Sequence, residues 1–229
     1  MNKNEVFCSV LDKKNEYDKS IRNININRVL MNSKEVQERD LFIAIRGGNS
    51  YINEALEKKA YVIYDNINIE VNKKYKNNAF YVKDSVIFLQ KFAKEWRNTL
   101  NLKVIGITGS NGKTTVKDII YQLLSKKYRG KKTEGNYNNH IGLPFTLLQA
   151  EENDEFIILE MGMSGFGEID LLGEIANPDV SIITNIGESH LEFLHTKENV
   201  FKAKTEILPH TKKILVLNGD DEYLKNVNN

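Results

Sequence analysis

The chain has 229 residues, enough for one large domain or two modest ones. Its formal net charge of +1, with 28% charged residues, gives no bulk field that would favour nucleic acid or a membrane surface as a partner. A single cysteine excludes an intramolecular disulfide, which fits a reducing compartment. We see neither a signal peptide nor an apolar run near the ~18 residues that cross a bilayer, so we expect a cytoplasmic protein without membrane insertion.

The first part of the chain has the pattern of a small α/β unit. Short apolar runs bounded by polar residues or glycine predict strands at residues 6–11, 41–45, 60–64 and 79–82. The pattern predicts a helix at residues 52–58. Ser85 suits the N-cap of a longer helix, because apolar residues recur at helical spacing as far as Leu100. We place the domain boundary between residues 84 and 85, so that this helix leads into the second unit.

Strand and helix patterns alternate in the second unit, residues 85–229. The predicted strands are residues 104–107, 156–160, 180–185 and 214–217, and the predicted helices are residues 113–126, 143–150, 169–176 and 197–208. The strands are apolar along their length, as expected when both faces of a sheet are covered. We therefore expect an α/β fold with a mostly parallel sheet, in which ligands bind at the carboxyl ends of the strands.

A glycine-rich loop stands between the first of these strands and its helix, at residues 106–115. Gly109 and Gly112 lack Cβ, so the backbone can adopt φ > 0 and bring its N–H groups close to an anion. The start of the helix adds free N–H groups and the positive end of its dipole. In such a P-loop, Lys113 reaches toward the β- and γ-phosphates, and Thr114 supplies a hydroxyl to Mg²⁺.

One position departs from the standard P-loop pattern. The pattern G-x-x-x-x-G-K-[ST] places a glycine at position 107, where this chain has Ile107, and the nearest glycine is Gly106. The alternative interpretation is a chance Gly-Lys-Thr turn. The strand before it and the helix after it favour the P-loop.

Three further residues follow or accompany the strands of the second unit. Glu160 closes an apolar strand, where a carboxylate is costly to bury unless it is paired or binds a metal, and Mg²⁺ is the natural partner beside a P-loop. Its alternative role is that of a structural partner for a helix N-terminus. His190 lies just past the next strand, although a loop histidine taken alone is usually a surface residue and Mg²⁺ seldom takes imidazole. Lys204 lies on an apolar helix face, where physics alone favours a snorkelling lysine.

Together these stretches resemble the Mur ligases, the family that builds the peptidoglycan precursor. The similar segments cover nearly the whole chain and are residues 32–47, 106–115, 135–144, 159–162, 167–169, 182–187, 189–192 and 201–207. The variants Asn-Asn-His-Ile-Gly and Glu-Met-Gly are similar to the MurF type. The resemblance implies a small N-terminal UDP-sugar-binding α/β domain, residues 1–84, followed by a P-loop ATP-binding domain, residues 85–229.

The resemblance also assigns roles to residues. The nucleotide would be bound by the loop and the asparagines that follow it: Gly109, Ser110, Asn111, Gly112, Lys113, Thr114, Thr115 and Asn138 or Asn139. Thr114 and Glu160 would bind one Mg²⁺, and His190 would help to bind a second. Lys204 matches the family's carbamylated lysine, whose added carboxylate ligates metal. The catalytic residues would be Lys113, His190 and Lys204, and Ser33, Lys34 and Arg46 would face the UDP part of the substrate.

The implied reaction is the formation of an amide in peptidoglycan and cell-wall biogenesis, which supports cell shape and division. ATP would phosphorylate the carboxylate that ends UDP-MurNAc-tripeptide, and the amine of D-Ala-D-Ala would attack the acyl phosphate. Metal ions and Lys113 would neutralise the charge that develops in phosphoryl transfer. We expect a monomer with these small-molecule substrates as its partners.

The chain departs from the family pattern at three places. The usual Asp-Ser-Arg near the start is Asn32-Ser33-Lys34, and the loop after Gly47 is short and lacks Asp-Gly-His. Family members continue beyond the point that corresponds to Asn229. We therefore expect a truncated ATP domain, no C-terminal domain for the amine substrate, and no amide formation by this chain alone.

Two rival functions remain open at this point. The first is a sibling ligase with another substrate, such as the diamino-acid-adding Mur ligase or folylpolyglutamate synthase, which a substrate panel distinguishes. The second is a P-loop nucleotide-binding module without ligase activity, which carbamylation of Lys204 would argue against.

Overall fold

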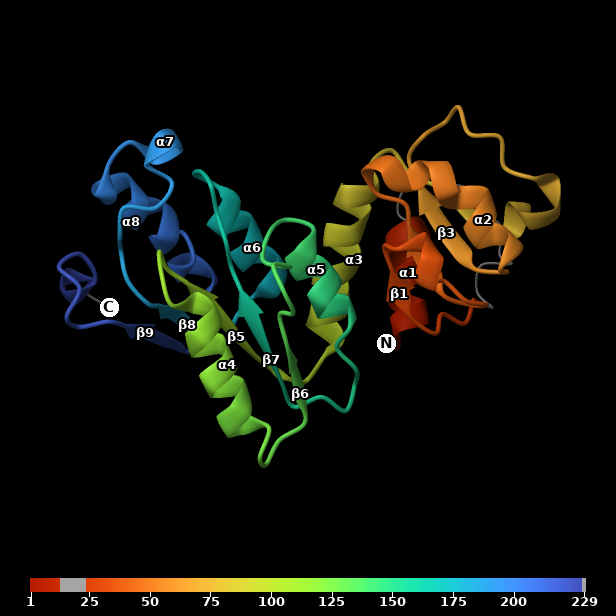
Figure 1. The fold of residues 1–229 in the computed structure, drawn as a ribbon. Helices are drawn as coiled ribbons and strands as arrows, with labels where there is room; N and C mark the ends of the chain where they lie inside the picture. Colours follow the sequence, from red (N-terminus) through yellow and green to blue (C-terminus); the bar gives the residue numbers. More distant parts are fainter. Residues whose placement is uncertain (13–23, 228–229) are drawn as a thin grey trace. The chain divides into compact units, whose positions relative to one another are not determined.

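A computed structural model describes residues 1–12 and 24–227 of the chain (Figure 1). The chain forms two compact units, Met1–Thr99 and Leu100–Asn229. Each contains one sheet, with strand order β1-β2-β3-β4 in the first unit and β6-β7-β5-β8-β9 in the second. Every strand pair in the described residues is parallel, which confirms the predicted α/β class with parallel sheets. In the described residues, no helix combines the length and the apolar character needed to cross a membrane.

The first unit surrounds its sheet with helices and 3-10 turns. Its strands are β1 (Val29–Leu30), β2 (Leu41–Ile43), β3 (Tyr61–Tyr64) and β4 (Ala79–Tyr81). Its helices are α1 (Lys3–Asp12), α2 (Ile52–Glu57) and α3 (Ser85–Thr99), with 3-10 turns η2 (Ser33–Glu35), η3 (Arg46–Tyr51) and η4 (Lys73–Asn78). Three of the four predicted strands and both predicted helices are confirmed. β1 was not predicted, because two residues are too few to show the apolar pattern that distinguishes a strand from a loop.

The predicted strand at residues 6–11 is wrong, because these residues belong to helix α1. Asn2 and Glu5 exchange side-chain-to-backbone hydrogen bonds of 3.0 Å in both directions, a capping box that starts the helix. Phe7 is fully buried, and its ring packs edge-on against Phe80, Phe88 and Phe92. The capping signal was present in the sequence, but the short apolar run also matched a buried strand.

Helix α3 belongs by its contacts to the first unit, where it packs against α1. Trp96 is buried at 2% exposure, and Lys3 Nζ lies 5.0 Å from its ring centre. The contact-based division therefore follows Thr99, at the end of this helix. The boundary between residues 84 and 85 was expected to separate the UDP-sugar-binding domain from the ATP-binding domain, and it stays a prediction.

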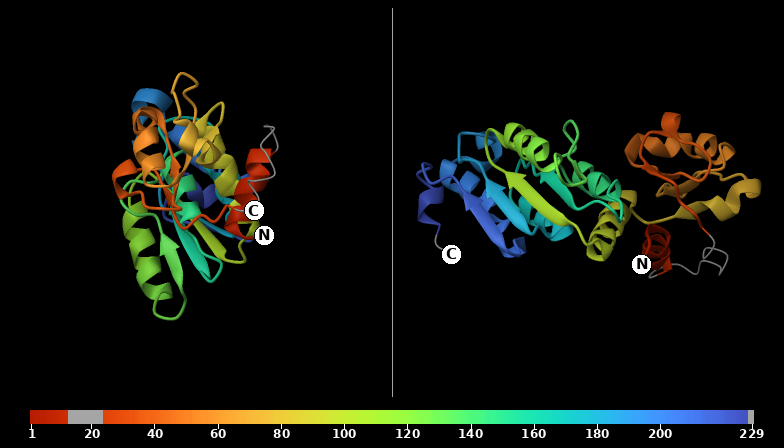
Figure 2. Two further views of the ribbon diagram at one scale, coloured as in Figure 1. Left: turned by 90° about the vertical axis from the view of Figure 1, so that its right-hand side faces the viewer. Right: turned by 90° about the horizontal axis from the view of Figure 1, so that it is seen from below.

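The second unit has β5 at the centre of its sheet, and its strands run side by side in both further views (Figure 2). The strands are β5 (Lys103–Thr108), β6 (Gly130–Lys132), β7 (Phe156–Glu160), β8 (Val180–Ile183) and β9 (Ile214–Leu217). The helices are α4 (Lys113–Leu124), α5 (Gly142–Leu148), α6 (Glu168–Ala176), α7 (Leu191–Leu194) and α8 (Lys197–Thr205). All four predicted strands and all four predicted helices are present, with ends shifted by a few residues. Edge strand β6 was missed because its sequence, Gly-Lys-Lys, has no strand pattern. These residues are a strand because they pair with β7.

Both faces of this sheet are covered at its central strand β5, whereas Ile214 and Val216 of edge strand β9 are exposed. Ile105 and Ile107 point toward the apolar face of α4. Gly106 points the other way, where an added Cβ would lie 2.9 Å from Met161 and 3.3 Å from Ile207, which follows α8. The carboxyl ends of β5, β7 and β8 therefore meet at one edge, where the predicted site residues lie.

Candidate active site

The loop between β5 and α4 has the backbone geometry of a phosphate-binding loop. Gly109 has φ 145° and Gly112 has φ 81°, as the sequence predicted. A Cβ on Gly109 would lie 1.9 Å from Thr184 Oγ1, so only glycine fits there. Gly112 precedes α4, and no described side chain caps the first N–H groups of that helix. These N–H groups are therefore available to an anion.

The loop is held from behind by the segment that follows β8. Ser110 N–H donates to the Asn185 carbonyl at 3.0 Å, and Asn111 N–H donates to Asn185 Oδ1 at 3.0 Å. The Ser110 hydroxyl in turn accepts hydrogen bonds from Gly187 N–H at 2.8 Å and from the Ser189 hydroxyl at 2.9 Å. From the sequence we selected only His190 in this segment as a site residue. The hydrogen bonds by which Asn185, Gly187 and Ser189 support the loop were not predicted.

Lys113 lies over the mouth of the loop. Its Nζ donates to the Gly109 carbonyl at 2.7 Å and approaches the Ser110 carbonyl at 3.4 Å. Burial lowers the pKa of Lys113, and the charge of Glu160 partly opposes this shift. The ammonium group is thus held at the position where a P-loop lysine meets phosphate oxygens.

Glu160 is almost fully buried, at 4% exposure, and has three neighbours. One carboxylate oxygen accepts from the Thr114 hydroxyl at 2.9 Å, and the other accepts from the Asn138 amide at 3.1 Å. Lys117 Nζ lies 3.8 Å from the first oxygen and is itself only 3% exposed. The structure therefore brings Thr114 and Glu160 together as predicted. The sequence missed Lys117, although a lysine one helical turn after Lys113 was a signal for it.

The structure separates the two candidate asparagines. Asn138 reaches Glu160 with its side chain, whereas Asn139 Oδ1 accepts from the N–H groups of Ile141 and Gly142 at 3.0 and 2.9 Å and so caps α5. Thr115 is exposed. Of this group, Asn138 is the residue placed beside the loop.

The donor atoms at Thr114 and Glu160 suit Mg²⁺, which prefers oxygen ligands and keeps several waters. In the described residues, no group of three or more His, Cys, Asp and Glu side chains converges on one point. One carboxylate and one hydroxyl therefore fit an ion that shares its coordination with phosphates, and not an all-protein cage.

Lys204 and His190 lie close enough to Lys113 for their charges to interact. Lys204, on α8, is 2% exposed, so the snorkelling interpretation is wrong. Burial, reinforced by Lys113, lowers the pKa of Lys204 to about 7. His190 precedes α7 with φ 58°, and burial followed by the charges of Lys204 and Lys113 lowers its pKa. The charged forms of these basic groups disfavour one another, and a bound anion would relieve that repulsion.

Comparison with known proteins agrees with this geometry. Residues 107–229 match the Mur ligase middle domain. The chain belongs to the Mur ligase family. It is 44% identical over 209 residues to the UDP-N-acetylmuramoyl-tripeptide–D-alanyl-D-alanine ligase of Bacillus subtilis (strain 168), a match that covers 88% of this chain and 45% of the relative.

Solved Mur ligase structures are similar as well. A MurF crystal structure from Acinetobacter baumannii superposes with a TM-score of 0.83 at 26% identity, over 96% of this chain and 49% of the other. The MurF ligase of Thermotoga maritima in complex with ADP gives a TM-score of 0.77 at 39% identity, over 86% and 47%. The chain therefore spans about half the length of the relatives that it matches.

The residues that the Mur ligase resemblance assigned to UDP lie in the first unit. Ser33 in η2 follows β1, and Arg46 in η3 follows β2, so both stand at the carboxyl edge of parallel strands. Ser33 is buried, and its carbonyl accepts from Lys58 Nζ at 3.0 Å, whereas Lys34 and Arg46 are exposed. Arg46 has φ 54°, an uncommon conformation for a residue with a side chain.

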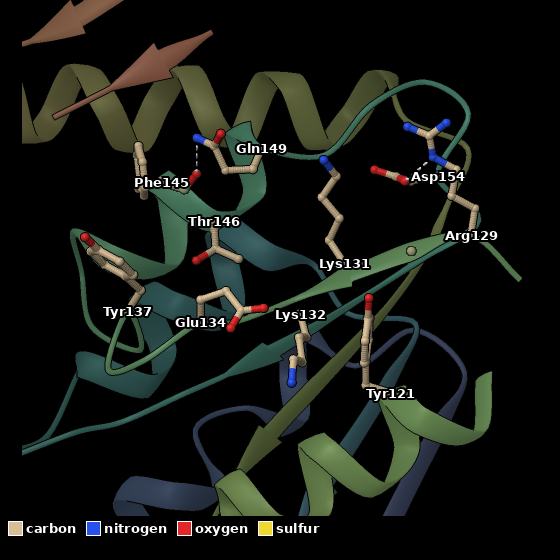
Figure 3. A pocket seen from close by; sticks show the side chains of 11 residues that line it. Tyr121, Arg129, Lys131, Lys132, Glu134, Tyr137, Phe145, Thr146, Gln149 and Asp154 are labelled. Atoms are coloured by element: carbon tan, nitrogen blue, oxygen red, sulfur yellow. Dashed lines mark hydrogen bonds and ion pairs between the residues drawn. The ribbon is translucent and has the colours of Figure 1, made fainter. Parts of the chain in front are cut away.

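A separate cavity of about 420 Å³ lies along β6 in the second unit of this Mur ligase (Figure 3). The residues that line it are Tyr121, Arg129, Gly130, Lys131, Lys132, Glu134, Tyr137, Phe145, Thr146, Gln149 and Asp154. None of the residues predicted for the site is among them. Its three basic residues are paired: Arg129 with Asp154 at 3.2 Å, Lys131 with Glu151 at 3.6 Å and Lys132 with Asp118 at 2.7 Å. The candidate active site is therefore the loop region and not this cavity.

Proposed function

We propose that this chain supplies the ATP site, and part of the nucleotide-sugar site, of a ligase that joins D-Ala-D-Ala to UDP-MurNAc-tripeptide in peptidoglycan synthesis. The observation that carries the proposal is the loop with Gly109 and Gly112 at positive φ, together with Thr114 bonded to Glu160. The Bacillus subtilis relative, named for this reaction, supports the choice of substrates.

Each residue at the loop has a definable part in phosphoryl transfer. The N–H groups of Gly112 and of the first turn of α4 bind the phosphates, whereas those of Ser110 and Asn111 hold the loop to Asn185. Lys113 places a positive charge at the transferring group, where charge develops. A Mg²⁺ ion would be held by Thr114 and Glu160 and would neutralise phosphate charge. Asn138 orients the carboxylate of Glu160 through its hydrogen bond.

The proposed reaction has two steps. The terminal carboxylate of the tripeptide attacks the γ-phosphorus of ATP, ADP leaves, and an acyl phosphate forms. The amine of D-Ala-D-Ala then attacks the acyl carbon, phosphate leaves, and the amine loses a proton. A carboxylate is a poor electrophile, so the phosphoryl group is needed to provide a leaving group.

We further propose that Lys204 carries a carbamate. An uncharged amine adds CO₂ and releases a proton, and the carbamate then offers two anionic oxygens as metal ligands, beside His190 as a ligand for a second ion. The lowered pKa and the burial of Lys204 support this, as does the absence of an acidic partner for its Nζ within the described residues. Intact mass measured under CO₂ tests it, because the carbamate adds the mass of one CO₂.

The remaining assignments belong to the same proposal. Ser33, Lys34 and Arg46 bind the UDP part, since they gather at one edge of the first sheet. A cytoplasmic location follows from ATP as a substrate, and a monomeric state is tested by light scattering. The domain boundary between residues 84 and 85 separates these two substrate sites.

The decisive experiment is a chimera in which these 229 residues replace the corresponding part of the Bacillus subtilis relative. Incubated with ATP, Mg²⁺, UDP-MurNAc-tripeptide and D-Ala-D-Ala, it should yield UDP-MurNAc-pentapeptide by mass, and its Lys113→Ala variant should not. A panel that includes diaminopimelate and glutamate tests sibling specificities. A folded chimera that binds ADP but makes no pentapeptide would overturn the proposal, and ligation of another amine would overturn the substrate assignment.

A further inference from the structure

Helix α6 begins without a capping side chain from its own sequence. Its N-cap residue is Gly167, at φ 80°, and glycine has no side chain that could accept a hydrogen bond from the first turn. The N–H groups of Gly167 and Asp170 donate instead to the two carboxylate oxygens of Glu206, at 2.8 and 3.2 Å. Glu206 is the C-cap residue of α8, so one helix supplies the anion that caps another.

A second contact joins the same two segments. His210 Nε2 lies 2.7 Å from Asp170 Oδ1. Gly173 provides the space for this approach, since an added Cβ would lie 2.6 Å from the His210 ring. The N-terminal half of α6 is therefore fixed to the residues that follow α8 at two points.

These contacts link the two elements that carry the proposed metal-site residues. Glu206 lies two residues after Lys204 on the same chain segment. Gly167 ends the loop that follows Glu160 at the end of β7. The carboxylate of Glu206 thus connects the helix of Lys204 to the loop of Glu160, while Ile207 packs near Gly106 beneath the phosphate loop.

We propose that Glu206 is a positioning residue: its carboxylate holds α8 against the N-terminus of α6 and thereby fixes Lys204 beside Lys113. The inference rests on the proposed function for its catalytic meaning, because Lys204 matters there as a ligand. The structural part does not depend on that function. Losing the carboxylate leaves two helix N–H groups without their acceptor, and α8 loses a contact within one turn of Lys204.

The first test measures the access of cyanate, which adds to uncharged amines, to Lys204 in the 229-residue chain without ATP. Four proteins are compared by peptide mass spectrometry: the unaltered chain, Glu206→Ala, Glu206→Gln and Glu198→Gln. The last is a matched control, because Glu198 lies on the same helix with its side chain 64% exposed. Lys126, exposed just after α4, is the internal reference, because Lys202 pairs with Glu198 at 2.8 Å and would itself respond to the control substitution. Lys117, 3% exposed on α4, reports general opening of the unit.

In Glu206→Ala, labelling of Lys204 relative to Lys126 should rise about fivefold, the change that losing a helix cap makes in a local opening equilibrium. Glu206→Gln keeps one acceptor oxygen and should give a smaller rise. Labelling of Lys204 in Glu198→Gln, and of Lys117 in every variant, should stay within about twofold, as for a surface substitution. Unchanged Lys204 labelling in Glu206→Ala overturns the proposal. So does an equal rise at Lys117, which would mean that Glu206 stabilises the whole unit.

The second test uses the active chimera. Glu206→Ala should lower kcat by roughly tenfold to a hundredfold, with KM for ATP within about twofold, because misplacing a catalytic group affects the transition state more than binding. Glu206→Gln should restore part of kcat. An unchanged kcat overturns the positioning role. If the unaltered chimera forms no amide, the proposed function fails, whereas the cyanate result still decides whether Glu206 fixes Lys204.

Discussion

The ion pair between Lys117 and Glu160 offers a sharp test of how the site is built. Both side chains are buried, at 3% and 4% exposure, and the closest nitrogen and oxygen atoms are 3.8 Å apart. At an effective dielectric constant of about 20, two unit charges at this distance attract by about 4 kcal/mol. In Lys117→Met the carboxylate stays buried without this cation, and breaking a buried pair typically costs about 3–5 kcal/mol. We therefore expect the second unit to lose about 3 kcal/mol of unfolding free energy.

Calorimetry measures the loss, and hydrogen exchange at the amides of β5 and β7 assigns the transition to the second unit. With about 2–4 °C per kcal/mol for a chain of this size, the melting temperature should fall by roughly 10 °C. The control is Lys131→Met, whose partner Glu151 is half exposed at 3.6 Å. That variant should change stability by less than about 1 kcal/mol.

The double variant Lys117→Met with Glu160→Gln completes a thermodynamic cycle. Removing both charges should recover most of the stability, with a coupling of about 1–3 kcal/mol between the two sites. Additive single effects, or a Lys117→Met protein as stable as the unaltered chain, would show that the two buried charges do not support each other.

Three other variants test the phosphate loop and its basic surroundings. In the chimera, Lys113→Ala should lower kcat about 10²- to 10³-fold at an unchanged melting temperature, because it removes one charge that stabilises the transition state; near-normal turnover would end the P-loop assignment. Gly109→Ala should weaken ADP binding to the chain by about tenfold or more, since its Cβ would lie 1.9 Å from Thr184 Oγ1 and displace the loop. The matched control is Gly219→Ala, where nothing lies within 4 Å of the new Cβ, and equal effects on calorimetric ADP affinity would contradict the steric argument. The pKa of Lys204 falls to about 7 in the folded state, below its ordinary value of about 10.4, so the unfolded state binds the proton more tightly. In CO₂-free buffer, where Lys204 is a free amine, the unfolding free energy should therefore rise with pH between about 7 and 10, and Lys204→Met should reduce this slope, as thermal melts across that range will show.

The sequence by itself determined the features that depend on local backbone chemistry. Gly109 and Gly112 predicted positive φ because they lack Cβ, and both adopt it. The apolar runs of β5, β7, β8 and β9 predicted strands with both faces covered, and all four are strands. The expected cover is incomplete at edge strand β9, where Ile214 and Val216 are exposed. The rule that ligands bind at the carboxyl ends of parallel strands then brought Thr114 and Glu160 together, and they lie 2.9 Å apart.

Only the tertiary structure decided the partners of the side chains. Thr114 and Glu160 are 46 residues apart in sequence, and the cation beside them, Lys117, follows from how α4 packs on β7. Asn139 turned out to cap α5 and Asn138 to reach Glu160, a choice that two adjacent identical residues cannot reveal. Burial likewise decided that Lys204 does not snorkel. A helical pattern fixes which face is apolar, but the depth of a lysine depends on what covers that face, and long-range packing alone sets that depth.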